Sequence, residues 1–200
     1  MAPRGLILDF GEVLTRAQSG EAVERLAALA GLPVDEFVAR YWRHRAEYDN
    51  GLAVGEYWRR VLERRDALPS TLAGALIDAD AASWTDYRAD VWDLAARFHA
   101  SGHRTAMLSN GVREIIGRVR AGRRLEDWFD VVIVSCEVGC CKPDPAIYQL
   151  CLEQLGEPAA QTLFVDDRAE NLQAAESIGL QTLQFTGDES VRLLRRLLGL

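Results

Sequence analysis

The stretch "LILDFGEVLT", Leu6–Thr15, combines an apolar run with an acidic residue at its end. Leu6, Ile7 and Leu8 form a short continuous apolar run, which is typical of a strand buried on both faces of a sheet. Asp9 follows this run directly, and Gly11 interrupts the pattern two residues later. Aspartate is almost never buried without a partner. The stretch therefore predicts a buried strand that presents Asp9 at its carboxyl end, and the groups around Asp9 decide its chemistry.

From residue 84 onward, short apolar runs alternate with single amphipathic helices. The strand-like runs are "HRTAMLS", "FDVVIVS", "QTLFVD" and "LQTLQF". Strands that are separated by one helix each can pair in parallel, because a parallel connection needs a long crossover. We predict an α/β fold with a three-layer, Rossmann-like core built on a parallel sheet.

Residues 16–83 show helical periodicity and no strand-like run. Ser19 is a typical N-cap for a first helix that ends at Gly31. A second helix is predicted from Pro33 to the turn at Asn50, and one or two more follow it. We predict that residues 1–15 and 84–200 form the core domain and that residues 16–83 form an inserted helical cap.

Composition limits the classes of partner. The chain has 200 residues, a formal net charge of -7 at pH 7 and a pI near 5.1, whereas nucleic-acid binding depends on clustered Lys and Arg. The N-terminus does not resemble a signal peptide, and no run approaches the roughly 20 apolar residues of a membrane span. We expect a cytoplasmic monomer or homodimer that acts on a small molecule and binds neither nucleic acid nor membrane.

Polar residues follow the predicted strands, and ligands of open parallel sheets bind at the carboxyl ends of the strands. The residues in question are Asp9, Ser109, Asn110, Asp166 and Asp167, together with Lys142 before a later helix. Clustered carboxylates repel one another, and Mg²⁺ favours carboxylate oxygens together with substrate phosphate. Asp9 would then attack phosphorus and form an aspartyl-phosphate, while Lys142 and Ser109 hold the phosphoryl group.

Four segments carry a family resemblance. "LILDFGEVLT", "MLSNG", "CKPDPAIY" and "FVDDRAEN" occur in the order and at roughly the spacing of the four motifs of the haloacid dehalogenase-like (HAD) hydrolase superfamily. The chain looks most similar to its small phosphatases, including bacterial glucose-1-phosphate phosphatases and the N-terminal phosphatase domain of bifunctional epoxide hydrolases. The helical stretch of residues 16–83 resembles the first-type cap of that superfamily.

The resemblance implies a role for each matching residue. Asp9 looks like the nucleophile, Ser109 like the phosphate-binding hydroxyl and Lys142 like the charge-balancing ammonium. The acids Asp166 and Asp167 resemble those that hold or orient Mg²⁺. The backbone carbonyl of Gly11 would complete the metal ligands together with Asp9, the amides of Asn110 and Gly111 would donate to phosphate, and Asn171 would support the metal site.

Gly11 departs from the family pattern. Most phosphatases of the family have a second aspartate here, which protonates the leaving group and later activates water. Glu12 is adjacent, but neighbouring side chains on an extended segment point to opposite sides. The general acid is therefore unassigned, and a water or a substrate group would take its place. General acid–base help contributes typically ~10²–10⁴-fold, so a slow enzyme or one limited to good leaving groups is expected.

The sequence favours a Mg²⁺-dependent phosphatase over two alternatives. A 2-haloacid dehalogenase would use Asp9 against carbon without a metal, which would leave the paired acids without a cation. A phosphate-binding regulatory module without turnover would explain Gly11.

A further open point is the stretch "YWRHRAEY", where Arg43, His44, Arg45 and Tyr48 form either a substrate clamp or, in our interpretation, the solvated face of an amphipathic helix.

Overall fold

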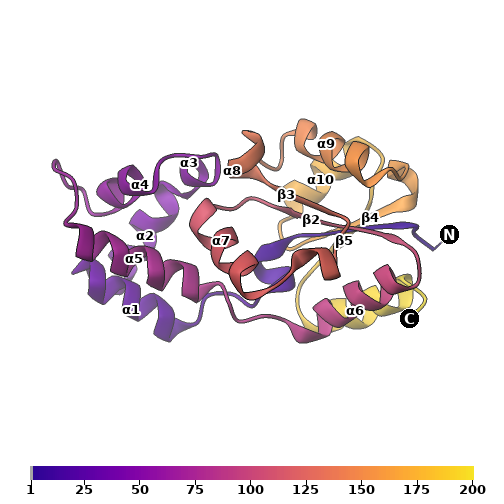
Figure 1. The fold of residues 1–200 in the computed structure, drawn as a ribbon, viewed down its shortest axis with the longest axis horizontal. Coiled ribbons are helices and arrows are strands. Elements are labelled where there is room, and N and C mark those ends of the chain that lie inside the picture. The colour runs from indigo at the N-terminus through magenta and orange to yellow at the C-terminus, as the bar shows by residue number, and fades with distance from the viewer. Residues whose placement is uncertain (1) are drawn as a thin grey trace.

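The computed structural model describes residues 2–200, which contain a five-stranded parallel sheet (Figure 1). The strands lie in the order β3-β2-β1-β4-β5. Their bounds are β1 Gly5–Leu8, β2 Arg104–Ser109, β3 Val131–Val134, β4 Thr162–Asp166 and β5 Gln181–Gln184. β1 lies in the middle, with Leu8 in register with Met107 of β2 and Val165 of β4. The predicted α/β fold is confirmed.

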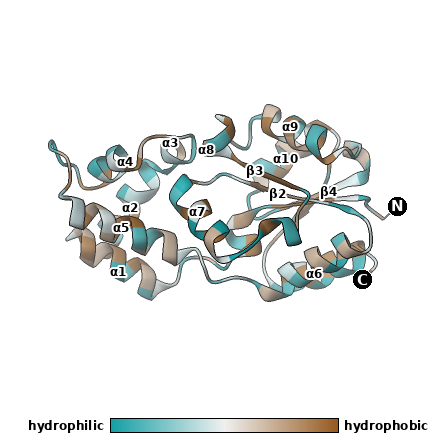
Figure 2. Ribbon diagram, in the orientation of Figure 1, coloured by the Kyte–Doolittle hydropathy of each residue, from teal (hydrophilic) through white to brown (hydrophobic). Residues whose placement is uncertain are grey.

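Helices cover both faces of the sheet. On one face lie α6, Ala89–Ala100, and α11, Asp188–Leu197, and on the other lie α9, Pro145–Leu155, and α10, Ala169–Ser177. Leu6 and Leu8 pack into the first of these layers and Ile7 into the second, because successive side chains of a strand point to opposite faces. Figure 2 shows the strands mostly in the brown of hydrophobic residues, while the surrounding helices carry teal polar positions.

Five helices follow β1 and form one end of the molecule, which we call the helical insertion (Figure 1). They are α1 Gly20–Ala30, α2 Val34–Arg43, α3 Arg45–Asp49, α4 Val54–Val61 and α5 Ser70–Ser83. Ser19 caps α1 by accepting a hydrogen bond from the amide of Ala22 at 3.2 Å, and Gly31 ends the helix with a φ of 67°. The assignment of residues 16–83 as a separate cap subdomain stays a prediction.

The prediction of one helix from Pro33 to Asn50 was wrong in one respect. The segment is broken at His44 into two helices, α2 and α3. His44 has a φ of -107° and a ψ of 0°, which lies outside the helical region. Tyr41 before the break and Tyr48 after it are both buried against Tyr57 of α4. Packing against α4 therefore overrides the helical periodicity.

Short elements complete the core. They are α7, Arg113–Gly122, and α8, Ser135–Val138, with two single 3₁₀ turns at Leu125–Asp127 and Ala159–Gln161.

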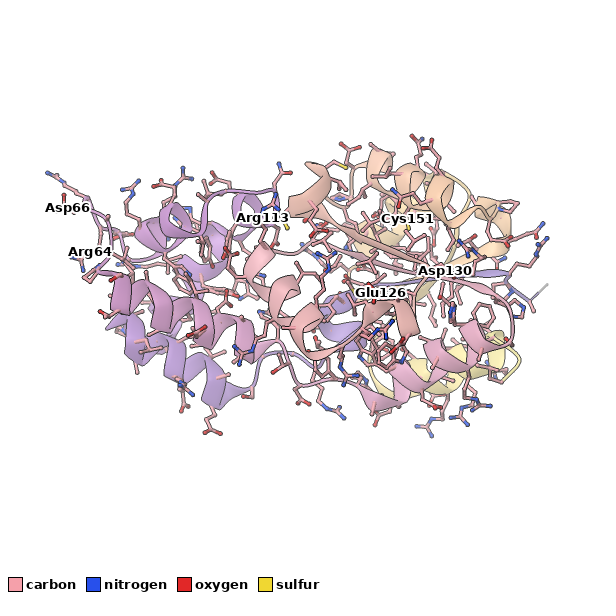
Figure 3. All side chains as sticks on the ribbon, viewed as in Figure 1. Arg64, Asp66, Arg113, Glu126, Asp130 and Cys151 are labelled. Carbon is pink, nitrogen blue, oxygen red and sulfur yellow. The ribbon has the colours of Figure 1, made fainter. Side chains whose placement is uncertain are left out.

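Figure 3 shows Arg64 and Asp66 on the loop between α4 and α5, at the end of the molecule farthest from the sheet. Among residues 2–200, no helix has the length and apolar character that crossing a membrane requires.

Candidate active site

The carboxyl ends of β1, β2 and β4 open into one cavity, which the helical insertion covers from the other side. Its core-side walls are Asp9, Gly11, Glu12, Ser109, Asn110, Gly111, Lys142, Asp167, Arg168 and Asn171, and its other walls include Trp42, Arg45, Asp49 and Trp84. Parallel strands end at the same edge of a sheet, so residues far apart in the chain meet here. Of the predicted site residues, all except Asp166 line this cavity, and Asp166 lies fully buried behind it.

Three carboxylates form the centre of the site. One oxygen each from Asp9, Asp166 and Asp167 lies within 4.8 Å of the others. Asp166 accepts hydrogen bonds from the amide of Arg168 at 2.8 Å and from the side-chain amide of Asn171 at 3.0 Å. These donors orient Asp166, while Asp9 and Asp167 face the cavity. Such a set of oxygens is the ligand type that a hard divalent cation prefers.

Lys142 is the cation that the protein itself places among these acids. Its ammonium lies 2.7 Å from Asp9 Oδ1 and 2.7 Å from Asp166 Oδ2, and it donates to the carbonyl of Leu108 at 3.0 Å. Burial would lower the pKa of Lys142, but the two carboxylates outweigh burial and raise it. Lys142 is the only lysine in the sequence. A compact point charge fits between two carboxylates where a planar guanidinium does not.

The acids remain short of positive charge. Burial raises the pKa of Asp9 to about 8, Lys142 opposes this effect, and Asp166 and Asp167 add to it. Burial likewise raises the pKa of Asp167 to about 6, with contributions from Asp166 and Glu12. In addition, the buried Oδ1 of Asn171 has no hydrogen-bond partner within the described part of the chain. Both observations fit a site that holds a divalent cation, because a cation would favour ionised Asp9 and Asp167.

The phosphate-binding residues predicted after β2 have distinct roles in the structure. Ser109 is buried and presents its side chain to the cavity. The side chain of Asn110 clamps the backbone of Lys142, with 2.8 Å contacts to both its amide and its carbonyl. The prediction that Gly111 offers a free amide needs correction, because this amide donates to Ser135 Oγ at 3.0 Å. Ser135 begins α8, a helix that the sequence pattern had merged into β3.

Gly11 and Glu12 form the turn that follows Asp9, within the π-helical segment Phe10–Leu14. Gly11 has a φ of -64° and a ψ of 133°, which any residue adopts, and a Cβ built on it would lie 3.6 Å from the ring of Trp84. Glu12 has a φ of 58°, a conformation uncommon for residues other than glycine. The segment is therefore not extended at Glu12, and the alternation argument against Glu12 was wrong, because this residue lines the cavity.

The helical insertion contributes side chains that sequence reasoning had assigned differently. Arg45 was interpreted as part of a solvated helix face, but it is 6% exposed and lines the cavity. Tyr48 is buried and donates to Glu114 of α7 at 2.9 Å, whereas Arg43 remains largely exposed. Trp42 and Asp49 were not predicted at all. The signal that marks them is the crowding of aromatic and charged residues at the break between α2 and α3.

The insertion also touches the core directly at the edge of the cavity. Ser135 Oγ donates to the backbone carbonyl of Asp49 at 2.5 Å, and Cys141 lies 3.6 Å from Asn50 Oδ1. These contacts join the end of α3 to Ser135, which accepts the amide of Gly111, and to Cys141, which precedes Lys142. The cavity is thereby shared between core and insertion.

Comparisons with known proteins agree with this architecture. A family model described as haloacid dehalogenase-like hydrolase matches residues 3–179. Phosphatase MT3486 from Mycobacterium tuberculosis is 26% identical over 191 residues, which cover 90% of this chain and 86% of that protein. Acyl-CoA dehydrogenase family member 10 from Mus musculus is 38% identical over 105 residues, or 52% of this chain, and the match covers only 10% of the mouse protein.

Solved structures show the same fold. HAD family enzyme bt-2542 from Bacteroides thetaiotaomicron superposes with a TM-score of 0.81 at 20% identity, over 98% of this chain and 100% of that chain. The wild-type form of that enzyme in complex with magnesium and inorganic phosphate superposes with a TM-score of 0.76 at 21% identity, over 92% of this chain and 95% of that chain.

Proposed function

Because this chain belongs to the haloacid dehalogenase-like hydrolase family, we propose that it is a Mg²⁺-dependent phosphatase that hydrolyses a small phosphorylated metabolite. The observation that carries the proposal is the meeting of Asp9, Asp166 and Asp167 within 4.8 Å, with a single buried lysine between two of them. Like charges at this separation are unfavourable unless a cation is bound. The similarity to a bacterial phosphatase and to an enzyme solved with magnesium and phosphate supports the same reading.

The residues that would hold Mg²⁺ are Asp9, Asp166, Asp167 and the carbonyl of Gly11. When bound, the ion supplies positive charge to the phosphoryl oxygens and keeps Asp9 ionised. Lys142 and Ser109 act on the phosphoryl group without contacting the ion. Lys142 supplies positive charge near the equatorial oxygens from its place between Asp9 and Asp166, and Ser109 offers a hydroxyl donor from the end of β2.

Asp9 is oriented for attack by its own neighbours. Its Oδ1 accepts the amide of Phe10 at 2.7 Å and pairs with Lys142, which leaves Oδ2 as the oxygen for attack. In the first step, Oδ2 forms a bond to phosphorus while the ester oxygen leaves and takes up a proton. In the second step, water attacks phosphorus, and Asp9 and inorganic phosphate are released. Gly11 brings no carboxylate for these proton transfers, so the proton is carried by Glu12, which lines the cavity, by a water or by a substrate group.

The acid cluster also favours this proposal over its alternatives. A haloacid dehalogenase would use Asp9 without a metal, and the single ammonium of Lys142 would then have to balance three clustered carboxylates. A binding module without turnover would retain the phosphate cradle but release no product. Hydrolysis of a phosphate ester that needs Mg²⁺ would separate the proposed phosphatase from both.

The test is hydrolysis of p-nitrophenyl phosphate with Mg²⁺ and with EDTA, by the wild type and by Asp9→Asn. We expect turnover only for the wild type with Mg²⁺. Asp127→Asn is the matched control, since Asp127 is an exposed carboxylate outside the cavity. Full activity of a folded Asp9→Asn variant, or activity on 2-haloacids that survives EDTA, would remove the proposal.

A further inference from the structure

Arg45 is a buried cation on the insertion side of the cavity, opposite the phosphate-binding residues. It is 6% exposed and begins α3. Its Nε donates to Asp49 Oδ1 at 2.7 Å, and its Nη1 contacts the hydroxyl of Tyr41 and lies 4.0 Å from Asp80. The ring of Trp84 lies 5.7 Å from its guanidinium carbon. These contacts hold the guanidinium in one orientation.

Two polar atoms of this group are available to a ligand. Nη2 of Arg45 and Oδ2 of Asp49 form no hydrogen bond within residues 2–200, although both residues line the cavity. In the described part of the chain, the side-chain nitrogen and oxygen atoms that are fully buried and have no hydrogen-bond partner belong to Trp58, Arg88 and Asn171. Nη2 of Arg45 and Oδ2 of Asp49 are not among them, so both atoms are accessible. The pair therefore presents a donor and an acceptor side by side to whatever fills the cavity.

The cluster around Arg45 offers no net positive charge to a second anion on the ligand. Arg45 is one cation facing two carboxylates, Asp49 and Asp80. Burial raises the pKa of both carboxyls while Arg45 lowers it, and even with one of them protonated the group is neutral rather than positive. Arg168 also lines the cavity and lowers the pKa of Asp49, but its guanidinium is paired with Glu170. A neutral hydroxyl suits this pair best, since it accepts from Nη2 and donates to Oδ2 at the same time.

Two indole rings border the same pair. Trp42 is 50% exposed at the cavity, and its ring centroid lies 6.5 Å from that of Trp84 in an edge-on arrangement. An exposed indole offers an apolar surface to the C–H groups of a ligand whose hydroxyls bind elsewhere. An exposed aromatic ring beside an oriented donor–acceptor pair is a surface suited to a hydroxylated carbon skeleton.

We propose that Arg45 and Asp49 bind a hydroxyl of the leaving group, with Trp42 against its carbon skeleton, so that the substrate is a phosphate monoester of a neutral hydroxylated compound. This inference rests on the proposed phosphatase function and adds the class of leaving group. It predicts discrimination against leaving groups that carry a carboxylate or a second phosphate and against those without hydroxyls.

The test uses matched phosphate esters with Mg²⁺: glycerol phosphate against propyl phosphate and phosphoglycerate, and a hexose monophosphate against cyclohexylmethyl phosphate. The measured quantity is the ratio of kcat/KM for the hydroxylated ester to that for its hydroxyl-free partner. Asp49→Asn keeps an oxygen for Arg45 Nε but replaces the acceptor with a donor. We expect it to lower this ratio about 10- to 100-fold, the usual effect of losing a hydrogen bond to a charged group.

Two further variants make the result specific. Trp42→Ala should raise KM for the hexose ester and for the cyclohexyl ester together, because both lose the indole surface. Glu47→Gln is the matched control, since Glu47 lies on α3 but is exposed and pairs with Arg60 outside the cavity. It should leave the ratio unchanged.

The outcomes separate this inference from the function on which it rests. Hydrolysis of p-nitrophenyl phosphate without preference for the hydroxylated esters, preference for phosphoglycerate over glycerol phosphate, or an unchanged ratio in Asp49→Asn overturns the inference alone. Absence of hydrolysis for every ester, including p-nitrophenyl phosphate, overturns the proposed function, and the inference falls with it.

Discussion

Replacing Lys142 with methionine removes the cation that lies between the buried carboxylates of Asp9 and Asp166. The substitution keeps a side chain of similar length but leaves Asp9, 7% exposed, and Asp166, 0% exposed, without the ammonium 2.7 Å from each. Removing one partner of a buried pair typically costs about 3–5 kcal/mol, because the other charge stays buried. In a chain of this size, such a loss lowers Tm by roughly 6–20 °C.

The cost depends on pH in a defined direction. The pKa of Asp9 is about 8 in the folded protein and 3.8 in the unfolded chain. Between these values the folded protein holds a proton that the unfolded chain releases, so stability is highest at low pH and falls as pH rises toward 8. Loss of Lys142 raises the pKa of Asp9 further and extends this window upward. The difference in unfolding free energy between wild type and Lys142→Met should therefore be larger at pH 9 than at pH 5.

Urea unfolding in EDTA at both pH values, repeated with Mg²⁺, measures these effects. Mg²⁺ should return more stability to the variant than to the wild type, since the variant has more uncompensated negative charge. Arg120→Met is the control, because its exposed pair with Glu137 contributes at most about 1 kcal/mol. A Lys142→Met cost no larger than that of Arg120→Met in EDTA at pH 9 would refute the account of the buried cluster.

Three other results are expected. Lys142→Arg should abolish hydrolysis of p-nitrophenyl phosphate while circular dichroism remains native, because a planar guanidinium does not match the two carboxylates that the ammonium joins. Gly11→Asp should raise kcat for alkyl phosphates by about 10²-fold or more, since the backbone and the 3.6 Å distance to Trp84 admit a side chain; an unchanged kcat would argue against a missing general acid. The rise in Tm on adding Mg²⁺ should shrink as pH falls, first below about 8, where Asp9 takes up a proton, and further below about 6, where Asp167 does, and a pH-independent rise would contradict this placement of the ion.

The core and its acidic centre could be predicted from local pattern. Short apolar runs, each followed by a polar residue, mark strands whose carboxyl ends meet in any parallel sheet, and this rule places Asp9, Ser109 and Asp166 together. Lys142 does not follow a strand directly, and its position was predicted from its place before the next helix. Strand periodicity and crossover length depend on neighbouring residues only, so they are readable from one sequence.

Tertiary packing decided the rest. Burial of Arg45 depends on Tyr41, Trp84 and Asp80, which come from different segments, and the break at His44 depends on packing against α4. In the same way, the amide of Gly111 is taken by Ser135, which is distant in sequence. Helical periodicity shows that a face is amphipathic but not which partner covers it. For that reason the sequence indicated how phosphate would be bound, while the wall that meets the leaving group emerged only from contacts between segments far apart in the chain.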